Sequence, residues 1–129
     1  MKGKAMDWNF KNGIPIYTQI VDELTMRIAS GAYAPGDKLA SVRELAMDAG
    51  VNPNTMQRAL SELERRGLVH SERTSGRFVT NDESILKELH RELAARYLDE
   101  FKEKLHKIGM SDEEIKEYMK EADNGKNRD

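Results

Sequence analysis

The chain has 129 residues, of which 34% are charged and 38% hydrophobic, and its formal net charge is −2. This length suits one compact domain or a small domain with an appendage, and the sequence has no apolar run of the roughly eighteen residues that a membrane span needs. Because it also lacks cysteine and an apolar segment behind its first residues, we expect no disulfide framework, no thiolate chemistry and no secretory signal, and hence a cytoplasmic protein.

Charge is distributed unevenly along the chain. Residues 1–80 carry eleven Lys and Arg against nine Asp and Glu, whereas residues 81–129 carry ten against fourteen. A mildly basic part joined to an acidic part is typical of a DNA-facing module attached to a module that contacts something else.

The first predicted helix follows a loosely held arm at residues 1–13, in which we expect Trp8 and Phe10 to hold the arm to the body. Pro15 suits an opening helical turn, because its missing N–H would be unpaired there anyway. Gly31 supplies a left-handed stop. Between them, apolar residues recur at helical spacing and form one stripe: Tyr17, Ile20, Val21, Leu24 and Ile28.

Two short helices are predicted next, separated by a glycine turn. Ser41-Val-Arg-Glu44 has the spacing of a capping box, and Gly50 ends the helix that it opens. Asn52-Pro53 combines an N-cap with a proline at the first helical position. Two capped helices around a tight turn indicate a helix-turn-helix, with a recognition helix at 52–66. The inner face of that helix carries Met56, Ala59, Leu60 and Leu63.

Two short strands follow Gly67. The segments 68–70 and 77–80 have strand composition, and the residues between them have turn composition. A hairpin directly after a recognition helix is a wing, for which we expect residues 73–77. The predicted fold class is therefore mainly α, with a winged helix-turn-helix domain at residues 1–80.

Residues 82–108 have the pattern of one long helix. Thr80-Asn-Asp-Glu83 resembles a capping box at its start, and Gly109 ends it. Ser111-Asp-Glu-Glu114 has the same spacing and opens a last helix. We expect a helical dimerisation region at 81–122 and a disordered tail at 123–129.

The apolar stripe of the long helix has two interpretations. It packs back onto its own winged domain, or it forms a two-fold seam with a second copy. We favour the second, because operators recognised by this fold are usually palindromic and mirror a protein dimer. The residues expected in the seam are Leu86, Leu89, Leu93, Tyr97, Phe101 and Leu105.

The segment from Pro35 to Val79 resembles the GntR family of bacterial regulators. The family pattern is matched at Pro35-Gly-Asp-Lys-Leu39, Ser41-Val-Arg-Glu-Leu-Ala46, Gly50-Val51, Thr55, Ala59-Leu60, Leu63, Gly67-Leu-Val69, Gly76 and Phe78-Val79. The stretch 52–58 and the two helices after the wing are similar to the YtrA-type subfamily. The chain departs from the pattern at Ala40, where proline is common, and at Ser75-Gly-Arg77, where a Gly-x-Gly is common.

The resemblance implies a homodimeric transcription regulator, most often a repressor, and suggests a transporter operon as its target. It also implies that Arg43 is a principal DNA contact, that Thr55 touches a phosphate and that the wing enters the minor groove. In such a fold the third helix lies in the major groove, where amides suit adenine and arginine suits guanine. The candidate DNA-binding residues are Arg43, Asn52, Asn54, Thr55, Gln57, Arg58, Arg73, Ser75, Gly76 and Arg77.

Some of these residues have a structural alternative. A role as a helix cap explains Asn52 equally well. Because the side chain of a cap is occupied locally, Asn54 and Gln57 are better candidates for base recognition. Arg43 could pair with a carboxylate on its own helix. Arg65 and Arg66 are explained as solvated charges that complement the helix dipole.

The sequence offers nothing for catalysis, a metal or another cofactor. His70, His90 and His106 are too scattered for metal-ligand spacing, and the carboxylates at 112–114 suit the first turn of a helix. The GntR proteins that carry an aminotransferase domain need far more than the 49 residues after the wing, so we expect no enzyme.

Our leading hypothesis is therefore a sequence-specific regulator whose partners are double-stranded DNA and a second copy, with no membrane and an unknown effector. The alternative is a winged-helix module that uses its groove-facing surface for protein contacts. Asn54, Gln57 and the two wing arginines argue against it, because the core of a protein interface should instead expose aromatic residues on that surface.

Overall fold

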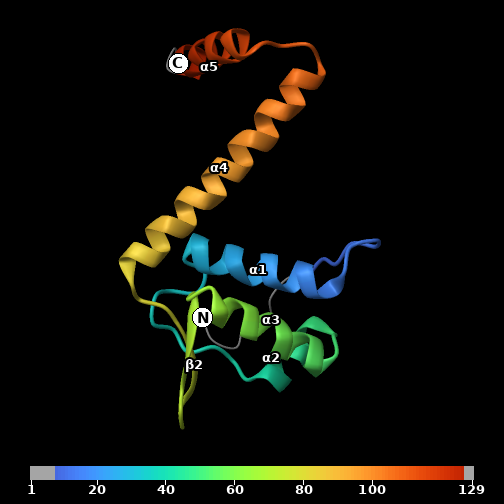
Figure 1. Cartoon of the computed structure of the whole chain (residues 1–129), viewed down its shortest axis with the longest axis vertical. Helices are drawn as coiled ribbons and strands as arrows, with labels where there is room; N and C mark the ends of the chain where they lie inside the picture. Colours follow the sequence, from blue (N-terminus) through green and yellow to red (C-terminus); the bar gives the residue numbers. More distant parts are fainter. Residues whose placement is uncertain (1–7, 127–129) are drawn as a thin grey trace. The chain divides into compact units, whose positions relative to one another are not determined.

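The computed structural model describes residues 8–126 (Figure 1). The chain divides into two compact units that meet between Leu89 and His90, inside the helix α4 (Glu83–Lys107). The expected boundary at residue 80 therefore moves into the long helix. The reason is that the start of α4 is apolar on one side: Ile85 Cδ1 lies 3.5 Å from where a Cβ on Gly67 would be, and Leu89 is buried.

The first unit begins with the arm and α1 (Ile16–Ser30). The predicted stripe is confirmed, because Ile20, Val21, Leu24 and Ile28 are all buried. Gly31 ends the helix with a φ of 84°, a left-handed conformation in which glycine avoids the steric cost of a Cβ.

The helices α2 (Val42–Ala49) and α3 (Pro53–Arg65) form the predicted helix-turn-helix. The capping box of α2 is present: Glu44 N donates to Ser41 Oγ at 3.1 Å, and Ser41 N donates to Glu44 Oε1 at 3.0 Å. α3 packs against both α1 and α2 (Figure 1). Its inner face is buried as expected, so the opposite face of α3 is left to solvent.

A two-stranded antiparallel hairpin follows α3. It consists of β1 (Val69–Glu72) and β2 (Gly76–Val79), with Val69 opposite Val79 and Ser71 opposite Arg77. The segment before α2 pairs with the outer edge of β2 through a bridge between Lys38 and Phe78, which the sequence pattern did not predict. The backbone bonds Leu39 N to Arg77 O (2.9 Å) and Val79 N to Asp37 O (2.8 Å) fix this segment.

The core of the first unit is built from α1, α3 and the base of the hairpin. Burial of a large apolar side chain of this kind stabilises the fold by roughly 1.5–3 kcal/mol. The largest side chains that are almost fully buried are Ile20, Leu24, Met56, Leu60, Leu63, Val69 and Val79.

The start of α4 is capped differently from the prediction. Asp82, not Thr80, is the cap, because Asp82 Oδ1 accepts from Ser84 N at 2.9 Å and from Ser84 Oγ at 2.7 Å. These bonds hold the pKa of the Asp82 carboxyl below its usual value. Thr80 supports the turn by accepting from Asp82 N at 3.1 Å. A side-chain cap from Asp82 to Ser84 therefore takes the place of the capping box that was expected between Thr80 and Glu83.

The second unit contains the rest of α4 and the helix α5 (Asp112–Lys126). The predicted capping box at its start is present, with Glu114 N donating to Ser111 Oγ at 3.1 Å and Ser111 N donating to Glu114 Oε1 at 2.9 Å. The prediction of a disordered tail from residue 123 is wrong for residues 123–126, which belong to α5. Asn124 and Gly125 are weak helix formers, but neither removes the N–H that continues the helix. Residues 127–129 lie outside the described residues.

The six residues expected in a dimer seam differ in exposure. Leu89 and Leu93 are each 7% exposed, so their side chains are covered within the chain. Leu86 and Leu105 are half-buried. Tyr97 and Phe101 are exposed, at 44% and 42%. The exposed apolar surface of α4 therefore lies further along the helix than the sequence pattern suggested.

Candidate nucleic-acid interface

Arg43 lies in the first turn of α2 and is exposed. The carboxylates with which it could pair on its own helix have other partners. Glu44 accepts from Ser41 N, and Asp48 Oδ2 accepts from Trp8 Nε1 at 3.1 Å. Within residues 8–126 Arg43 forms no ion pair, so its guanidinium is available to a ligand.

The N-terminus of α3 is organised by Asn52. Its Oδ1 accepts from Asn54 N at 2.7 Å, which confirms the structural role that the sequence suggested for this residue. The Asn54 side chain is exposed and has no hydrogen bond within the described chain. Because the cap engages only the oxygen of Asn52, its amide nitrogen can still donate to a ligand.

The exposed face of α3 carries a row of polar side chains. Asn54, Gln57 and Ser61 follow each other at helical spacing and are all exposed, and Gln57 Nε2 donates to Ser61 Oγ at 3.3 Å. Ser61 was not among the predicted residues, although its i+4 spacing from Gln57 is visible in the sequence. Thr55 is half-buried and lies beside these three residues. We call Asn54, Thr55, Gln57 and Ser61 together the polar row.

Arg58 lies on another side of α3. Its Cζ is 4.5 Å from the centre of the Tyr17 ring, so the guanidinium stacks on α1 rather than joining the polar row. The structure therefore gives Arg58 a partner within the protein, and any DNA contact would be made by the exposed edge of a stacked guanidinium.

Arg65 and Arg66 form ion pairs at the end of α3. Glu62 accepts from Arg65 Nε at 3.0 Å and from Arg66 Nε at 2.7 Å. These hydrogen bonds lower the pKa of Glu62 to about 2. Both arginines are thus explained by pairing with a carboxylate one turn earlier, in addition to the helix dipole.

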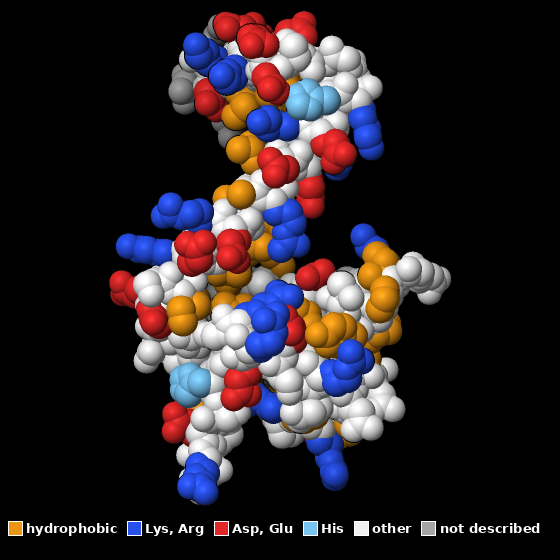
Figure 2. Space-filling view, in the orientation of Figure 1, with side chains coloured by type: hydrophobic (Ala, Val, Ile, Leu, Met, Phe, Trp, Pro, Cys, Tyr) orange, Lys and Arg blue, Asp and Glu red, His pale blue; other side chains and the backbone are white. Residues whose placement is uncertain are grey.

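The predicted wing residues separate into two groups. Arg73, Ser75 and Gly76 are exposed at the turn of the hairpin, and Figure 2 shows basic side chains at its free end. Arg77 is half-buried, with its Nε 3.5 Å from Glu64 Oε1 on α3. Arg73 is therefore presented outward, while Arg77 faces the recognition helix.

One basic residue beside the wing was missed by the sequence analysis. Lys38 is exposed, and its side chain runs along Gly76. The segment 35–39 has turn composition, so no strand signal indicated that it would pair with β2. Only the bridge to Phe78 brings Lys38 to the hairpin.

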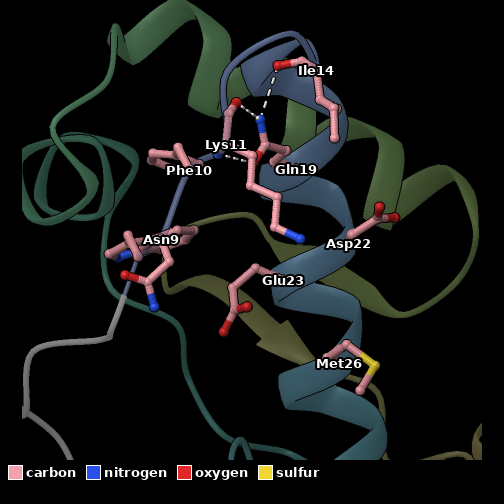
Figure 3. Close-up of a pocket in the computed structure, with 9 residues that line it drawn as sticks. Asn9, Phe10, Lys11, Ile14, Gln19, Asp22, Glu23 and Met26 are labelled. Carbon is pink, nitrogen blue, oxygen red and sulfur yellow. Dashed lines mark hydrogen bonds between the residues drawn. The ribbon is translucent and has the colours of Figure 1, made fainter.

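Residues 8–13 of the expected arm are held against α1, as Figure 3 shows, and residues 1–7 lie outside the described residues. Gln19 accepts from Lys11 N at 2.7 Å and donates to the carbonyls of Lys11 and Ile14 at 3.0 and 2.9 Å. Trp8 stacks near Phe10 with ring centres 5.6 Å apart and bonds to Asp48, which confirms that these residues hold the arm. The arm and α1 enclose a shallow groove of about 320 Å³.

Among residues 8–126, no group of three or more His, Cys, Asp or Glu is placed to hold a metal ion. In the same part of the chain, no helix combines the length and the apolarity that crossing a membrane requires.

The sequence matches a known family over the same elements. Residues 16–79 match the gntR family of bacterial regulatory proteins. The HTH-type transcriptional regulator YhcF of Bacillus subtilis (strain 168) is 41% identical over 115 residues, which cover 89% of this chain and 95% of the relative. The chain belongs to the GntR family. The HTH-type transcriptional repressor YtrA of the same organism is 36% identical over 112 residues, covering 86% of each chain.

Solved structures agree with this assignment. A GntR family transcriptional regulator from Listeria monocytogenes has a TM-score of 0.78 at 38% identity, covering 87% of this chain and 98% of the other. AraR(DBD) in complex with operator ORX1 has a TM-score of 0.55 at 27% identity, covering 60% of this chain and 99% of the other. The predicted fold class and the YtrA-type resemblance are confirmed. The protein is a DNA-binding transcription regulator of the GntR family, which is a family of regulators and not of enzymes.

Proposed function

We propose that this GntR-family protein is a homodimeric repressor that binds a palindromic operator, with α3 in the major groove and the hairpin at the minor groove. The observation that supports it best is the combination of the polar row with the unpaired Arg43. Side chains with free donors and acceptors, carried on the exposed side of a recognition helix, are what direct reading of base edges requires.

The polar row and Arg43 supply different contacts. The amides of Asn54 and Gln57 can pair with adenine N6 and N7 in a bidentate manner, and the fork of Arg43 suits guanine O6 and N7 or a phosphate. The N-terminus of α3 favours a nearby phosphate because the helix dipole is positive there, although Pro53 has no N–H and Asn54 N already donates to Asn52. In this arrangement Thr55 contacts a phosphate at the edge of the groove.

The proposed second copy is seated on the second unit. Phe101 and Leu105 of α4 and Tyr118 and Met119 of α5 line an apolar groove of about 500 Å³, together with Ile108, Met110 and Ala122. Ile108 and Tyr118 are 72% and 63% exposed. These apolar side chains lie together in one groove, and a contiguous exposed apolar patch is typical of an interaction surface.

A second copy accounts for this groove better than an unrelated partner. Recognition of a palindrome needs two half-sites about one helical turn, ~10 bp, or a small multiple apart, which a symmetric dimer provides. The seam that we propose therefore begins at Tyr97 and includes α5, while Leu89 and Leu93 serve the interior of the chain. The proposal that a transporter operon is the target is supported by the YtrA-type relationship alone.

The decisive experiment is selection of DNA fragments from a genomic library by the purified protein, followed by binding titrations with the selected duplex. Arg43→Ala should weaken binding to that duplex by about 1–3 kcal/mol, and Arg91→Ala, an exposed arginine on α4, serves as the matched control. Circular dichroism of both variants checks that they are folded. Equal affinity of Arg43→Ala and wild type would contradict the proposed role of Arg43.

The competing function, a module for protein contacts, predicts a different result. Affinity of a DNA-binding protein falls steeply as salt is raised, because phosphate contacts release counterions. Absence of measurable duplex binding at 50 mM salt would overturn the proposed function and favour the protein-contact module.

A further inference from the structure

The hairpin has two faces with different surroundings. Side chains alternate along a strand, and directly opposite residues of an antiparallel pair share a face. The register therefore places Ser71 and Arg77 on the face that also carries the buried Val69 and Val79. The opposite, outer face carries His70, Glu72, Gly76 and Phe78.

The inner face is attached to α3 by Glu64. Its Oε1 accepts from Ser71 Oγ at 3.1 Å and lies 3.5 Å from Arg77 Nε. The Arg77 side chain is only 20% exposed. One carboxylate oxygen on the recognition helix thus contacts one residue from each strand, an arrangement that fixes the hairpin relative to α3.

The outer face is occupied by Lys38. Its pairing with Phe78 puts its side chain on this face, and its Cε lies 3.1 Å from where a Cβ on Gly76 would be. The corresponding distance for Nζ is 4.0 Å. Gly76 has a φ of +112° and no side chain, so it both permits the turn and leaves room for the lysine stem.

The carboxylates near this face have other partners. Glu72 Oε2 lies 3.3 Å from His70 Nε2, and Glu44 accepts from Ser41 N at 3.0 Å. The His70 ring stacks on Phe78 with centres 6.0 Å apart, which holds the His70 side chain on this face. Lys38 is exposed and forms no ion pair within the described residues. Hydrogen bonds from Ser41 lower the pKa of Glu44 most, and the charge of Lys38 lowers it to a smaller extent. Lys38 therefore interacts only weakly with this carboxylate, and its ammonium remains available at the side of the hairpin.

We infer that Lys38 contacts the DNA backbone as part of the wing, and that Arg77 is a positioning residue that holds the hairpin on α3 through Glu64. This inference rests on the proposed function and deepens it, since it divides the basic residues of the wing between contact and support. A lysine is suited to the first role as a compact point charge for a phosphate, and the fork of an arginine to the second.

The test uses the full chain and a fluorescently labelled duplex of mixed sequence, about 20 bp long, titrated between 50 and 200 mM KCl. Each phosphate contact contributes about 0.9 to the slope of log affinity against log salt. Lys38→Gln should lower this slope by about 0.9, and Lys38→Arg should restore it. Lys87→Gln, an exposed lysine on α4, is the matched control and should leave the slope unchanged. A wild-type slope for Lys38→Gln would overturn the assignment of Lys38.

The role of Arg77 needs a second measurement. Arg77→Gln and Glu64→Gln should both accelerate hydrogen exchange of the hairpin amides, because each removes the ion pair between Arg77 and Glu64 and so weakens the attachment to α3. Arg77→Gln should leave the salt slope unchanged even if affinity falls. A loss of about 0.9 in slope with unchanged hairpin exchange would show that Arg77 contacts phosphate and would overturn its positioning role.

Failure of this inference can be told apart from failure of the proposed function. If the wild-type protein binds the selected duplex but Lys38→Gln behaves like wild type, only the assignment of Lys38 is overturned. If wild type binds no duplex at 50 mM KCl, the proposed function and this inference are both overturned.

Discussion

The guanidinium of Arg58 stacks on the ring of Tyr17, with Cζ 4.5 Å from the ring centre. The contact joins the outer side of α3 to the first full turn of α1, where Tyr17 is half-buried. It places a charged residue of the recognition helix in a defined position before any ligand arrives. Arg58 therefore differs from Asn54 and Gln57, whose side chains are exposed and form no hydrogen bond to another element among residues 8–126.

We predict that this contact contributes to stability. Replacing Tyr17 with Leu keeps an apolar side chain but removes the cation–π interaction, and should lower the free energy of unfolding by about 0.5–1 kcal/mol. Urea denaturation measures the change. A double-mutant cycle with Arg58→Gln isolates the pair, and a coupling energy of zero would show that the stacking is without energetic effect.

Gln57 should determine base preference. Gln57→Ala removes a bidentate amide from the centre of the polar row, and should change which base is preferred at one position of each half-site by about 1–3 kcal/mol. Binding to a panel of operators with single substitutions measures this. Arg91→Ala, which changes an exposed residue of α4 outside the proposed interface, is the control. A uniform loss across the panel would mean that Gln57 contacts the phosphate backbone instead.

Asn52 and Asn54 should affect different properties, Asn52 the stability of the fold and Asn54 the affinity for DNA. Asn52→Ala removes the cap of α3, and should lower the free energy of unfolding by about 1 kcal/mol. Asn54→Ala leaves the cap intact because its backbone N–H remains, so its stability should be near wild type while its operator affinity falls. Thermal denaturation and binding titrations of both variants separate the two roles. Equal stability of the variants would contradict the capping role of Asn52.

Glu62 should make stability depend on acid pH. Its folded pKa, about 2, lies below the ordinary 4.5 because Arg65 and Arg66 donate hydrogen bonds to its carboxylate. Its contribution is therefore fully present above about pH 4.5 and is lost as pH falls toward 2. Denaturation of wild type and Glu62→Gln at pH 6 and pH 3 should show a difference that narrows at the lower pH. If the stability difference between wild type and Glu62→Gln became larger at pH 3, the proposed effect of the lowered Glu62 pKa would be contradicted.

The apolar groove of the second unit should control oligomeric state. Phe101→Glu places a charge among apolar neighbours, and should give a monomer in sedimentation equilibrium with weakened operator binding. Lys107→Glu changes charge on the same helix outside the groove, and should leave the dimer intact. A point substitution is preferable to truncation at residue 82, because Ile85 and Leu89 belong to the first unit. Persistence of a dimer with Phe101→Glu would remove this groove from the seam.

The sequence by itself determined most of the local structure. Ser41 with Glu44, Asn52 with Pro53, and Ser111 with Glu114 are local signals, because a cap and the amides that it binds are separated by only a few residues. The helical spacing of the apolar residues likewise determined which face of α3 is buried. The helix-turn-helix, the hairpin and the exposed polar row follow from these short-range rules.

Tertiary structure alone decided the partners of the charged side chains that contact another element. Arg77 and Glu64 are thirteen residues apart, and Arg58 and Tyr17 lie on different helices, so their pairings depend on how the elements pack. The position of Lys38 also depends on packing. It lies beside the wing because its segment pairs with β2, and the turn composition of that segment does not predict this pairing. Long side chains find their partners after the backbone is arranged. For that reason sequence patterns located Arg73 and Arg77 but missed Lys38, and they did not show that Arg77 faces α3.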